Sequence, residues 1–123
     1  MYTILIVDDD PALLELLVTV LEEPGYVVMT AKNGYEAVSI LADRHVDLMI
    51  TDIRMPGLSG FELARQAKMF RPHLHIIYMS GFFDDRDGGG RREYGVLLQK
   101  PVRPEALLAT IQNEISAGPR PAA

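Results

Sequence analysis

The chain has 123 residues, of which 48% are hydrophobic and 24% charged, a composition typical of one globular domain and unlike that of a disordered chain. A formal net charge of -5 argues against direct nucleic-acid binding, which needs clustered Lys and Arg. No cysteine is present and no apolar run reaches the roughly 20 residues of a membrane span, so we exclude thiol chemistry and expect a cytoplasmic location without a membrane partner.

Short apolar segments alternate with segments of helical period from the start of the chain. Thr3–Val7 is a β-branched apolar run, as expected for a strand that is buried on both faces. Pro11–Glu23 carries leucines and valines at helical spacing, and Pro24-Gly25 ends this helix. Tyr26–Thr30 is predicted as the second strand and Gly34–Asp43 as the second helix.

The same alternation continues through the second half of the chain. The predicted elements are two strands that flank a helix, then a short strand and a last helix: Asp47–Thr51, Gly60–Phe70, Leu74–Met79, Val96–Leu98 and Pro104–Ser116. Strands separated by helices of this length indicate right-handed crossovers and a parallel sheet with helices on both faces. The predicted class is therefore a doubly wound α/β fold.

Two segments depart from the alternation. A fourth helix belongs between Leu74–Met79 and Val96–Leu98, but the chain there contains Gly88–Gly90, and each glycine costs a helix interior about 1 kcal/mol relative to Ala. We expect this helix to be short, disordered or absent. Residues 118–123 read as a flexible tail or linker, which leaves residues 1–117 as the domain.

Polar side chains that could bind a ligand or react lie where predicted strands end. They are Asp8, Asp9, Asp10, Asp52, Ser80 and Lys100. In a parallel sheet these ends meet at one edge, where ligands bind. Clustered carboxylates resist ionisation unless a cation compensates, and Mg²⁺ takes one or two carboxylates while keeping waters. The alternative is that the first three aspartates only cap the following helix, a role that we expect of Asp10.

Asp52 is the candidate reactive group. A carboxylate can accept a phosphoryl group, while a metal ion and a cation such as Lys100 neutralise the charge that develops on it. Ser80 can offer a hydroxyl hydrogen bond to a phosphoryl oxygen. Taken singly, Asp52 has a simpler interpretation as a turn former, Lys100 as a solvated charge and Ser80 as a strand-end cap. The joint placement of the three residues at strand ends favours a role in phosphoryl transfer.

These motifs together resemble the receiver domain of two-component response regulators. The likeness covers residues 3 to about 116 and includes Val7-Asp8-Asp9, the run DLMITDIRMPGLSG over residues 47–60, Ser80-Gly81 and Lys100-Pro101. The resemblance implies a flavodoxin-like (βα)5 fold with a five-stranded parallel sheet of order 2-1-3-4-5. It also implies a phosphoprotein of two-component signal transduction rather than an enzyme with a separate substrate.

The resemblance further implies a role for each site residue. Asp52 would accept a phosphoryl group from a phosphohistidine on a histidine kinase or a histidine phosphotransfer protein. Mg²⁺ would bind Asp9, Asp52 and the backbone carbonyl of Arg54, with Asp8 acting through a water. Lys100 would pair with Asp52, and Ser80 would turn toward the phosphoryl group. A cis peptide bond is expected at Lys100-Pro101.

Departures from the family pattern affect how a signal would leave the site. The residue after Ser80 is usually small, often Ala, and is here Gly81, and the position three residues before Lys100 is often aromatic and is here Leu97. Two other functions stay open at this point. One is a phosphatase of the haloacid dehalogenase type with Asp8 as nucleophile. The other is a degenerate receiver that binds partners without phosphorylation.

Overall fold

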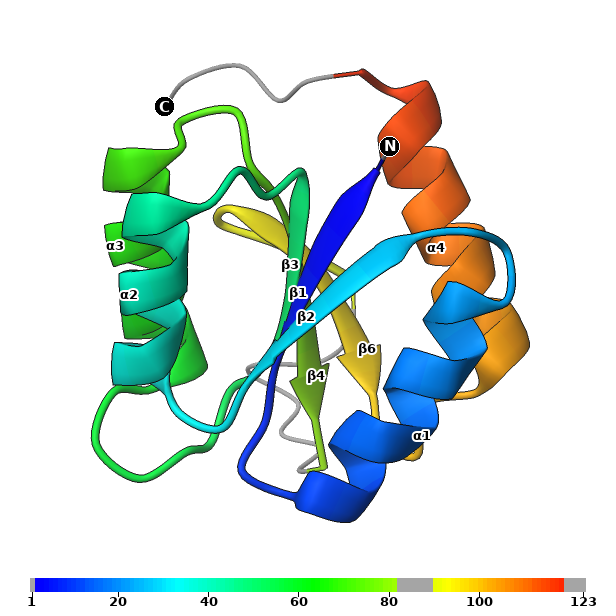
Figure 1. Ribbon diagram of the computed structural model, residues 1–123, viewed down its shortest axis with the longest axis horizontal. Helices are drawn as coiled ribbons and strands as arrows, with labels where there is room; N and C mark the ends of the chain where they lie inside the picture. The colour runs from blue at the N-terminus through cyan, green and yellow to red at the C-terminus, as the bar shows by residue number, and fades with distance from the viewer. Residues whose placement is uncertain (1, 82–89, 119–123) are drawn as a thin grey trace.

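The computed structural model describes residues 2–81 and 90–118, which form a sheet between two layers of helices (Figure 1). Helices α2 and α3 cover one face of the sheet, and α1 and α4 cover the other. The strands are β1 (Thr3–Val7), β2 (Val27–Ala31), β3 (Leu48–Asp52), β4 (His75–Ser80), β5 (Gly90–Arg92) and β6 (Gly95–Gln99). The helices are α1 (Pro11–Glu22), α2 (Gly34–Asp43), α3 (Gly60–Phe70) and α4 (Pro104–Ser116).

The order of the strands is β2-β1-β3-β4-β6-β5. The first five strands in this order are parallel to one another, and β6 is the fifth strand that the sequence predicts. The expected parallel sheet of order 2-1-3-4-5 is therefore confirmed. The register pairs Val7 with Thr51 and Asp52 with Met79, so β1, β3 and β4 end at the same edge.

Strand β5 is an addition that the sequence does not predict. It pairs antiparallel with β6 at the edge of the sheet, through a turn at Glu93 and Tyr94. Tyr94 has a φ of 76°, and the hydroxyl of Tyr78 donates to the carbonyl oxygen of Glu93 at 3.0 Å, which anchors this turn on β4. Most of the segment in which a short or absent fourth helix was predicted, residues 82–89, lies outside the described residues.

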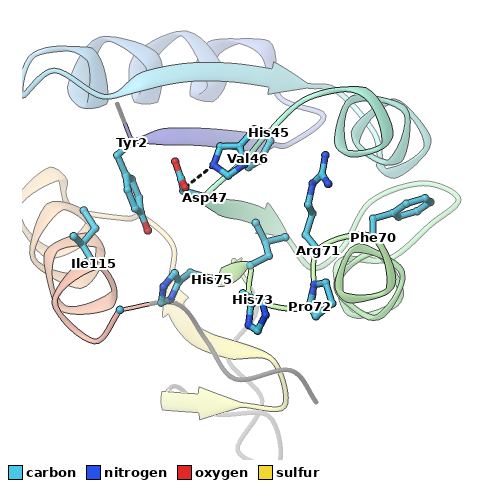
Figure 2. Close-up of a pocket in the computed structure, with 12 residues that line it drawn as sticks. Tyr2, His45, Val46, Asp47, Phe70, Arg71, Pro72, His73, His75 and Ile115 are labelled. Carbon is cyan, nitrogen blue, oxygen red and sulfur yellow. Dashed lines mark hydrogen bonds and ion pairs between the residues drawn. The ribbon is translucent and has the colours of Figure 1, made fainter.

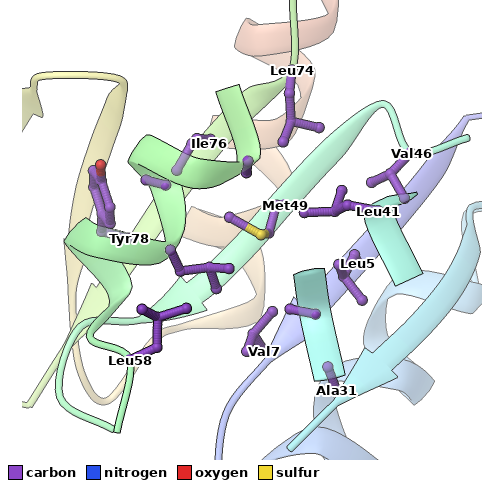
Figure 3. Close-up of a cluster of buried hydrophobic side chains, with 14 of the residues drawn as sticks. Leu5, Val7, Ala31, Leu41, Val46, Met49, Leu58, Leu74, Ile76 and Tyr78 are labelled. Carbon is purple, nitrogen blue, oxygen red and sulfur yellow. The ribbon is translucent and has the colours of Figure 1, made fainter. Parts of the chain in front are cut away.

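Alternate side chains of each central strand enter two hydrophobic clusters. On β1, Ile4 and Ile6 face α1 and α4, whereas Leu5 and Val7 face α2 and α3. Figure 3 shows the cluster that contains Leu5 and Val7, in which Met49 lies among side chains of the neighbouring strands and helices. Because both faces are buried, the strands are continuously apolar, as the sequence predicts.

Side chains at three helix starts satisfy backbone N–H groups. The carboxylate of Asp10 accepts from Ala12 N at 3.0 Å, which confirms its predicted role as the cap of α1. Asn33 and Ser59 cap α2 and α3 in the same way. These caps begin each helix directly after the loop that leaves the carboxyl end of a strand, which places those loops around the site.

Candidate functional site

Three carboxylates gather at the carboxyl ends of β1 and β3. One ligand oxygen from each of Asp8, Asp9 and Asp52 lies within 4.8 Å of the other two. Asp8 follows β1 and Asp52 ends β3, and the direct pairing of these strands brings the two side chains together. Asp8 is fully buried, Asp52 is 7% exposed and Asp9 is exposed, so the cluster opens to solvent at Asp9.

The three consecutive aspartates after β1 have different roles. Asp10 caps α1, whereas Asp8 and Asp9 belong to the carboxylate cluster. The backbone N–H of Asp10 donates to Asp8 Oδ1 at 2.9 Å, which orients the Asp8 side chain toward the sheet edge. The interpretation of this run as a helix cap alone therefore holds for Asp10 and does not account for the other two residues.

Lys100 supplies a positive charge to the cluster. Its Nζ atom lies 2.9 Å from Asp8 Oδ2 and 3.4 Å from Asp52 Oδ2. The backbone N–H of Lys100 donates to the carbonyl oxygen of Ser80 at 2.7 Å, which joins the ends of β6 and β4. The peptide bond between Lys100 and Pro101 is cis, as predicted. The resemblance pairs Lys100 with Asp52, but the shorter contact is with Asp8.

The pKa values of two groups of the site are raised, for different reasons. Burial raises the pKa of Asp52, and Asp8 adds to this effect, while Lys100 and a backbone hydrogen bond from Arg54 oppose it without cancelling it. Burial alone lowers the pKa of Lys100, but its contacts with Asp8 and Asp52 outweigh burial and raise it. A carboxylate that is costly to ionise beside a cation is suited to binding further positive charge.

The remaining predicted residues surround Asp52. Ser80 ends β4 and is 7% exposed, and its neighbour Met79 pairs with Asp52 in the sheet. The carbonyl oxygen of Met79 accepts from Ile53 N at 3.0 Å, so the loop after Asp52 is bonded to the strand that carries Ser80. Arg54 is exposed in that loop. The structure thus brings Asp8, Asp9, Asp52, Ser80 and Lys100 to one edge, with Arg54 beside them.

Glycines in the loop between β3 and α3 hold its backbone close to the site, a role that the sequence alone did not assign. The N–H of Gly60 donates to the carbonyl oxygen of Ile53 at 2.8 Å. A Cβ on Gly60 would overlap the carbonyl oxygen of Asp52 and lie 2.8 Å from Ile53 Cα. Gly57 has a φ of +81°, which favours glycine. The spacing of these glycines after Asp52 was the available signal.

The doubly wound parallel sheet and the acidic strand-end site define the class of the protein as a flavodoxin-like domain with its ligand site at the sheet edge. The model of the response regulator receiver domain family matches residues 4–112. The chain therefore belongs to the response regulator receiver domain family, as the sequence resemblance predicted, and the phosphatase alternative with Asp8 as nucleophile is not supported.

Individual relatives agree with this assignment. The chain is similar to protein PilH of Pseudomonas aeruginosa, with 37% identity over 96% of this chain and 100% of PilH. It is 35% identical to the transcriptional regulatory protein GlrR of Escherichia coli over 91% of this chain. The chain spans about a quarter of that relative, since the match covers 26% of GlrR.

Solved structures give the same result. A response regulator receiver domain protein from Clostridium thermocellum superposes with a TM-score of 0.81 at 29% identity, over 95% of this chain and 96% of that one. Response regulator TrrA of Thermotoga maritima, crystallised in complex with Mg²⁺ and BeF, superposes with a TM-score of 0.79 at 31% identity, over 93% and 99% of the two chains. Within the described residues, no helix is long and apolar enough to cross a membrane.

Proposed function

We propose that Asp52 accepts a phosphoryl group from the phosphohistidine of a histidine kinase or a phosphotransfer protein, and that this modification switches partner binding. The observation that carries the proposal is the position of the Asp52 carboxylate between two further carboxylates and the Lys100 ammonium at the sheet edge. The Asp52 side chain is 10% exposed and that of Asp8 only 1%, so Asp52 is the more accessible of the two buried acids.

In the proposed step, a carboxylate oxygen of Asp52 attacks the phosphorus atom of the phosphohistidine. The new P–O bond forms as the P–N bond breaks, and the leaving imidazole takes the electron pair and then a proton. The Nζ atom of Lys100 lies 3.4 Å from Asp52 Oδ2, and its charge offsets negative charge as the phosphoryl group arrives. The hydroxyl of Ser80, at the adjacent strand end, donates a hydrogen bond to a phosphoryl oxygen.

The residues of the cluster fit a hard divalent cation. Their donors are carboxylate oxygens, and one of the three side chains is exposed and two are buried. We assign direct contacts to Asp9, Asp52 and the backbone carbonyl of Arg54. Asp8 already bonds Lys100 and Asp10 N, so we assign its contact to a water. When bound, Mg²⁺ would neutralise charge on the acceptor and on the phosphoryl oxygens.

Phosphorylation of Asp52 would change the net charge of the site. A phosphoryl group adds about -1.5 to -2 charge at a site that already holds three carboxylates. Hydrolysis of the acyl phosphate by water then resets the domain slowly, so the protein acts as a switch and not as an enzyme with turnover.

We assign this switch to residues 1–117 and propose a cytoplasmic location, in keeping with the absence of cysteine.

The test is chemical modification by a small phosphodonor. With acetyl phosphate and Mg²⁺, we expect the wild type to gain one phosphoryl group, mapped to Asp52 by peptide mass spectrometry. Asp52→Asn should gain none, and Asp43→Asn, which alters an exposed acid at the end of α2, should behave as the wild type. Phosphate on Asp8, or equal modification of Asp52→Asn, would overturn the assignment. A wild type that stays unmodified would indicate a receiver that works without phosphorylation.

A further inference from the structure

A pocket of about 480 Å³ opens at the edge of the sheet opposite the carboxylate cluster (Figure 2). This volume is within the size range of sites that bind small molecules. The walls come from the residue before β1, the connection from α2 to β3, the connection from α3 to β4 and the end of α4. We call it the basal pocket, and its walls include Tyr2, Val46, Asp47, Phe70, Arg71 and Leu74.

Two polar atoms in the walls of the basal pocket need a partner that the described part of the chain does not supply. The Tyr2 hydroxyl and Arg71 Nε are buried, and neither has a hydrogen-bond partner among the described residues. A buried polar group that is left unpaired destabilises a fold, so such groups are usually paired. Because both side chains line the same pocket, one occupant can satisfy both.

Arg71 determines the charge of that occupant. Its Nη2 atom donates to the carbonyl oxygen of Arg44 at 2.9 Å, which holds the guanidinium in place. Nε can only donate and Nη2 has a second N–H, so one edge of the guanidinium matches the two oxygens of a carboxylate. Among the described residues that line the pocket, Arg71 is the only lysine or arginine, so one negative charge balances it.

The acids of this region already have partners of their own. Asp47 Oδ2 accepts from Thr3 N at 2.7 Å, and Asp47 Oδ1 lies 2.8 Å from His45 Nε2. The carboxylate of Glu114 lies 3.4 Å from the ring of His75, and both of these side chains are buried. Neither acid therefore lacks a donor, and the unpaired groups of the pocket are those of Tyr2 and Arg71.

The basal pocket is polarised from one side to the other. Figure 2 shows Tyr2 and Asp47 on one side and Arg71 on the other. Burial raises the pKa of the Tyr2 hydroxyl, and Asp47 and Glu114 raise it further, so this hydroxyl stays protonated beside negative charge. A ligand that lies across the pocket therefore fits with its negative charge at Arg71 and a neutral oxygen at Tyr2.

The surfaces between these two ends are apolar. Val46 and Leu74 are buried, and Ile115 is half-buried at the end of α4. Phe70 lines the pocket with a ring that is 45% exposed to solvent. Apolar walls with a few placed polar groups are typical of small-molecule sites, and the walls here match a flat apolar body.

We propose that the basal pocket binds a small aromatic carboxylate. The carboxylate accepts from Nε and Nη2 of Arg71, and the ring lies against Val46, Leu74 and Phe70. A neutral oxygen at the far end of the ring accepts from the Tyr2 hydroxyl. Small rotations of the Tyr2 and Arg71 side chains bring their covered polar atoms to the ligand.

This ligand would give the domain a second binding site, separate from the phosphoacceptor. It would contact the start of β1 and the connections after α2 and α3 together, and so raise the free energy of unfolding. The carboxylate cluster lies at the other ends of the strands, so binding does not require phosphorylation of Asp52.

The test is an NMR titration of the whole chain with 4-hydroxybenzoate. We expect saturable shifts of the backbone amides of Val46, Asp47 and Leu74, with a dissociation constant of about 1 mM or lower. The neutral amide 4-hydroxybenzamide has the same shape and should bind about tenfold more weakly, because it lacks the charge that Arg71 recognises. Shifts that do not saturate, shifts centred outside the basal pocket, or equal binding of the amide would overturn the proposal.

Matched variants assign the two ends of the ligand. Arg71→Gln should weaken 4-hydroxybenzoate binding about tenfold, and Arg65→Gln, at a 56% exposed side chain that does not line the pocket, should leave it unchanged. Tyr2→Phe removes only the hydroxyl and should weaken binding about fivefold. Tyr26→Phe, whose hydroxyl accepts from Gln112 outside the pocket, should have no effect.

Urea denaturation of each variant shows whether it is folded. If Arg71→Gln does not fold, Tyr2→Phe and the comparison of the acid with its amide still decide the outcome. Equal binding by Arg71→Gln and Arg65→Gln, or by Tyr2→Phe and Tyr26→Phe, would contradict the proposed contacts.

Discussion

The ammonium group of Lys100 lies 2.9 Å from the carboxylate of Asp8, a residue 92 positions earlier in the chain. The Asp8 side chain is only 1% exposed, so water does not compensate its charge and Lys100 does. The same ammonium lies 3.4 Å from Asp52. One cation therefore both stabilises a buried structural charge and stands beside the proposed phosphoacceptor, which links the stability of the fold to the state of the site.

Replacing Lys100 by Met should destabilise the protein. Removing one partner of a buried ion pair leaves an uncompensated charge, which costs about 3 kcal/mol or more in the free energy of unfolding. Urea denaturation at neutral pH measures this loss. Lys32→Met changes an exposed lysine and should shift the free energy of unfolding by less than about 0.5 kcal/mol. Equal stability of the two variants would show that Asp8 does not depend on Lys100.

Magnesium should stabilise the wild type through the carboxylate cluster. A ligand that binds only the native state at 100 times its dissociation constant raises the free energy of unfolding by about 2.7 kcal/mol. We expect most of this gain to be lost in Asp9→Asn, which removes the exposed ligand of the cluster. Thermal unfolding with and without Mg²⁺ measures the gain.

The matched control is Asp10→Asn. It changes the neighbouring acid, which caps α1 and lies outside the cluster, and asparagine caps a helix as well as aspartate does. This variant should keep the full response to Mg²⁺. A response that is lost equally in both variants would mean that overall negative charge, and not the cluster, attracts the ion.

Much of the fold could be predicted because its signals are local. Continuous apolar runs mark strands that are buried on both faces, and the polar residue that ends each run marks the sheet edge, which is how Asp8, Asp52 and Lys100 could be placed together. The strand limits differ by single residues: Asp52 ends β3 and Ser80 ends β4, so both are themselves paired in the sheet.

Other features depend on contacts that no local pattern encodes. Strand β5 has only three residues, one of them a glycine of low strand propensity, and it forms because its backbone pairs with β6. The preference of Lys100 for Asp8 over Asp52 depends on side-chain distances set by three separate strands. The histidines at 45, 73 and 75 show no ligand spacing in the sequence, yet the fold brings them to one pocket.

Replacing Asp52 by Asn should stabilise the protein at neutral pH without Mg²⁺. Because the pKa of Asp52 is raised in the native state, that state binds the proton more tightly than the unfolded chain does. Ionised Asp52 therefore costs stability above its native pKa, and this cost disappears as the pH falls through that pKa. Asparagine carries no charge at any pH, so its advantage should be largest at neutral pH.

Urea denaturation between pH 7 and pH 4 checks the sign of this effect. The difference between Asp52→Asn and the wild type should shrink as the pH falls, because protonated aspartate and asparagine are similar in size and charge. Asp43→Asn, at an exposed position, should show little difference at any pH. An advantage of Asp52→Asn that grows toward low pH would mean that the native state stabilises the ionised carboxylate and does not destabilise it.

Replacing Gly60 by Ala should damage both the fold and the site. The added Cβ would overlap the carbonyl oxygen of Asp52, and backbone atoms cannot turn aside as a flexible side chain can. Overpacking of this kind costs about 1–3 kcal/mol in the free energy of unfolding, and relief of the overlap must move Asp52 or the loop that begins at Ile53. We therefore expect lower stability in urea together with slower modification of Asp52 by acetyl phosphate.

Gly81→Ala is the matched control at the same edge. Among the described residues its Cβ would meet only Lys100 Cδ, at an ordinary 3.8 Å, so it should change stability by less than about 0.5 kcal/mol. A Gly60→Ala protein that matched Gly81→Ala in both measurements would show that the close approach of α3 to Asp52 does not position the acceptor.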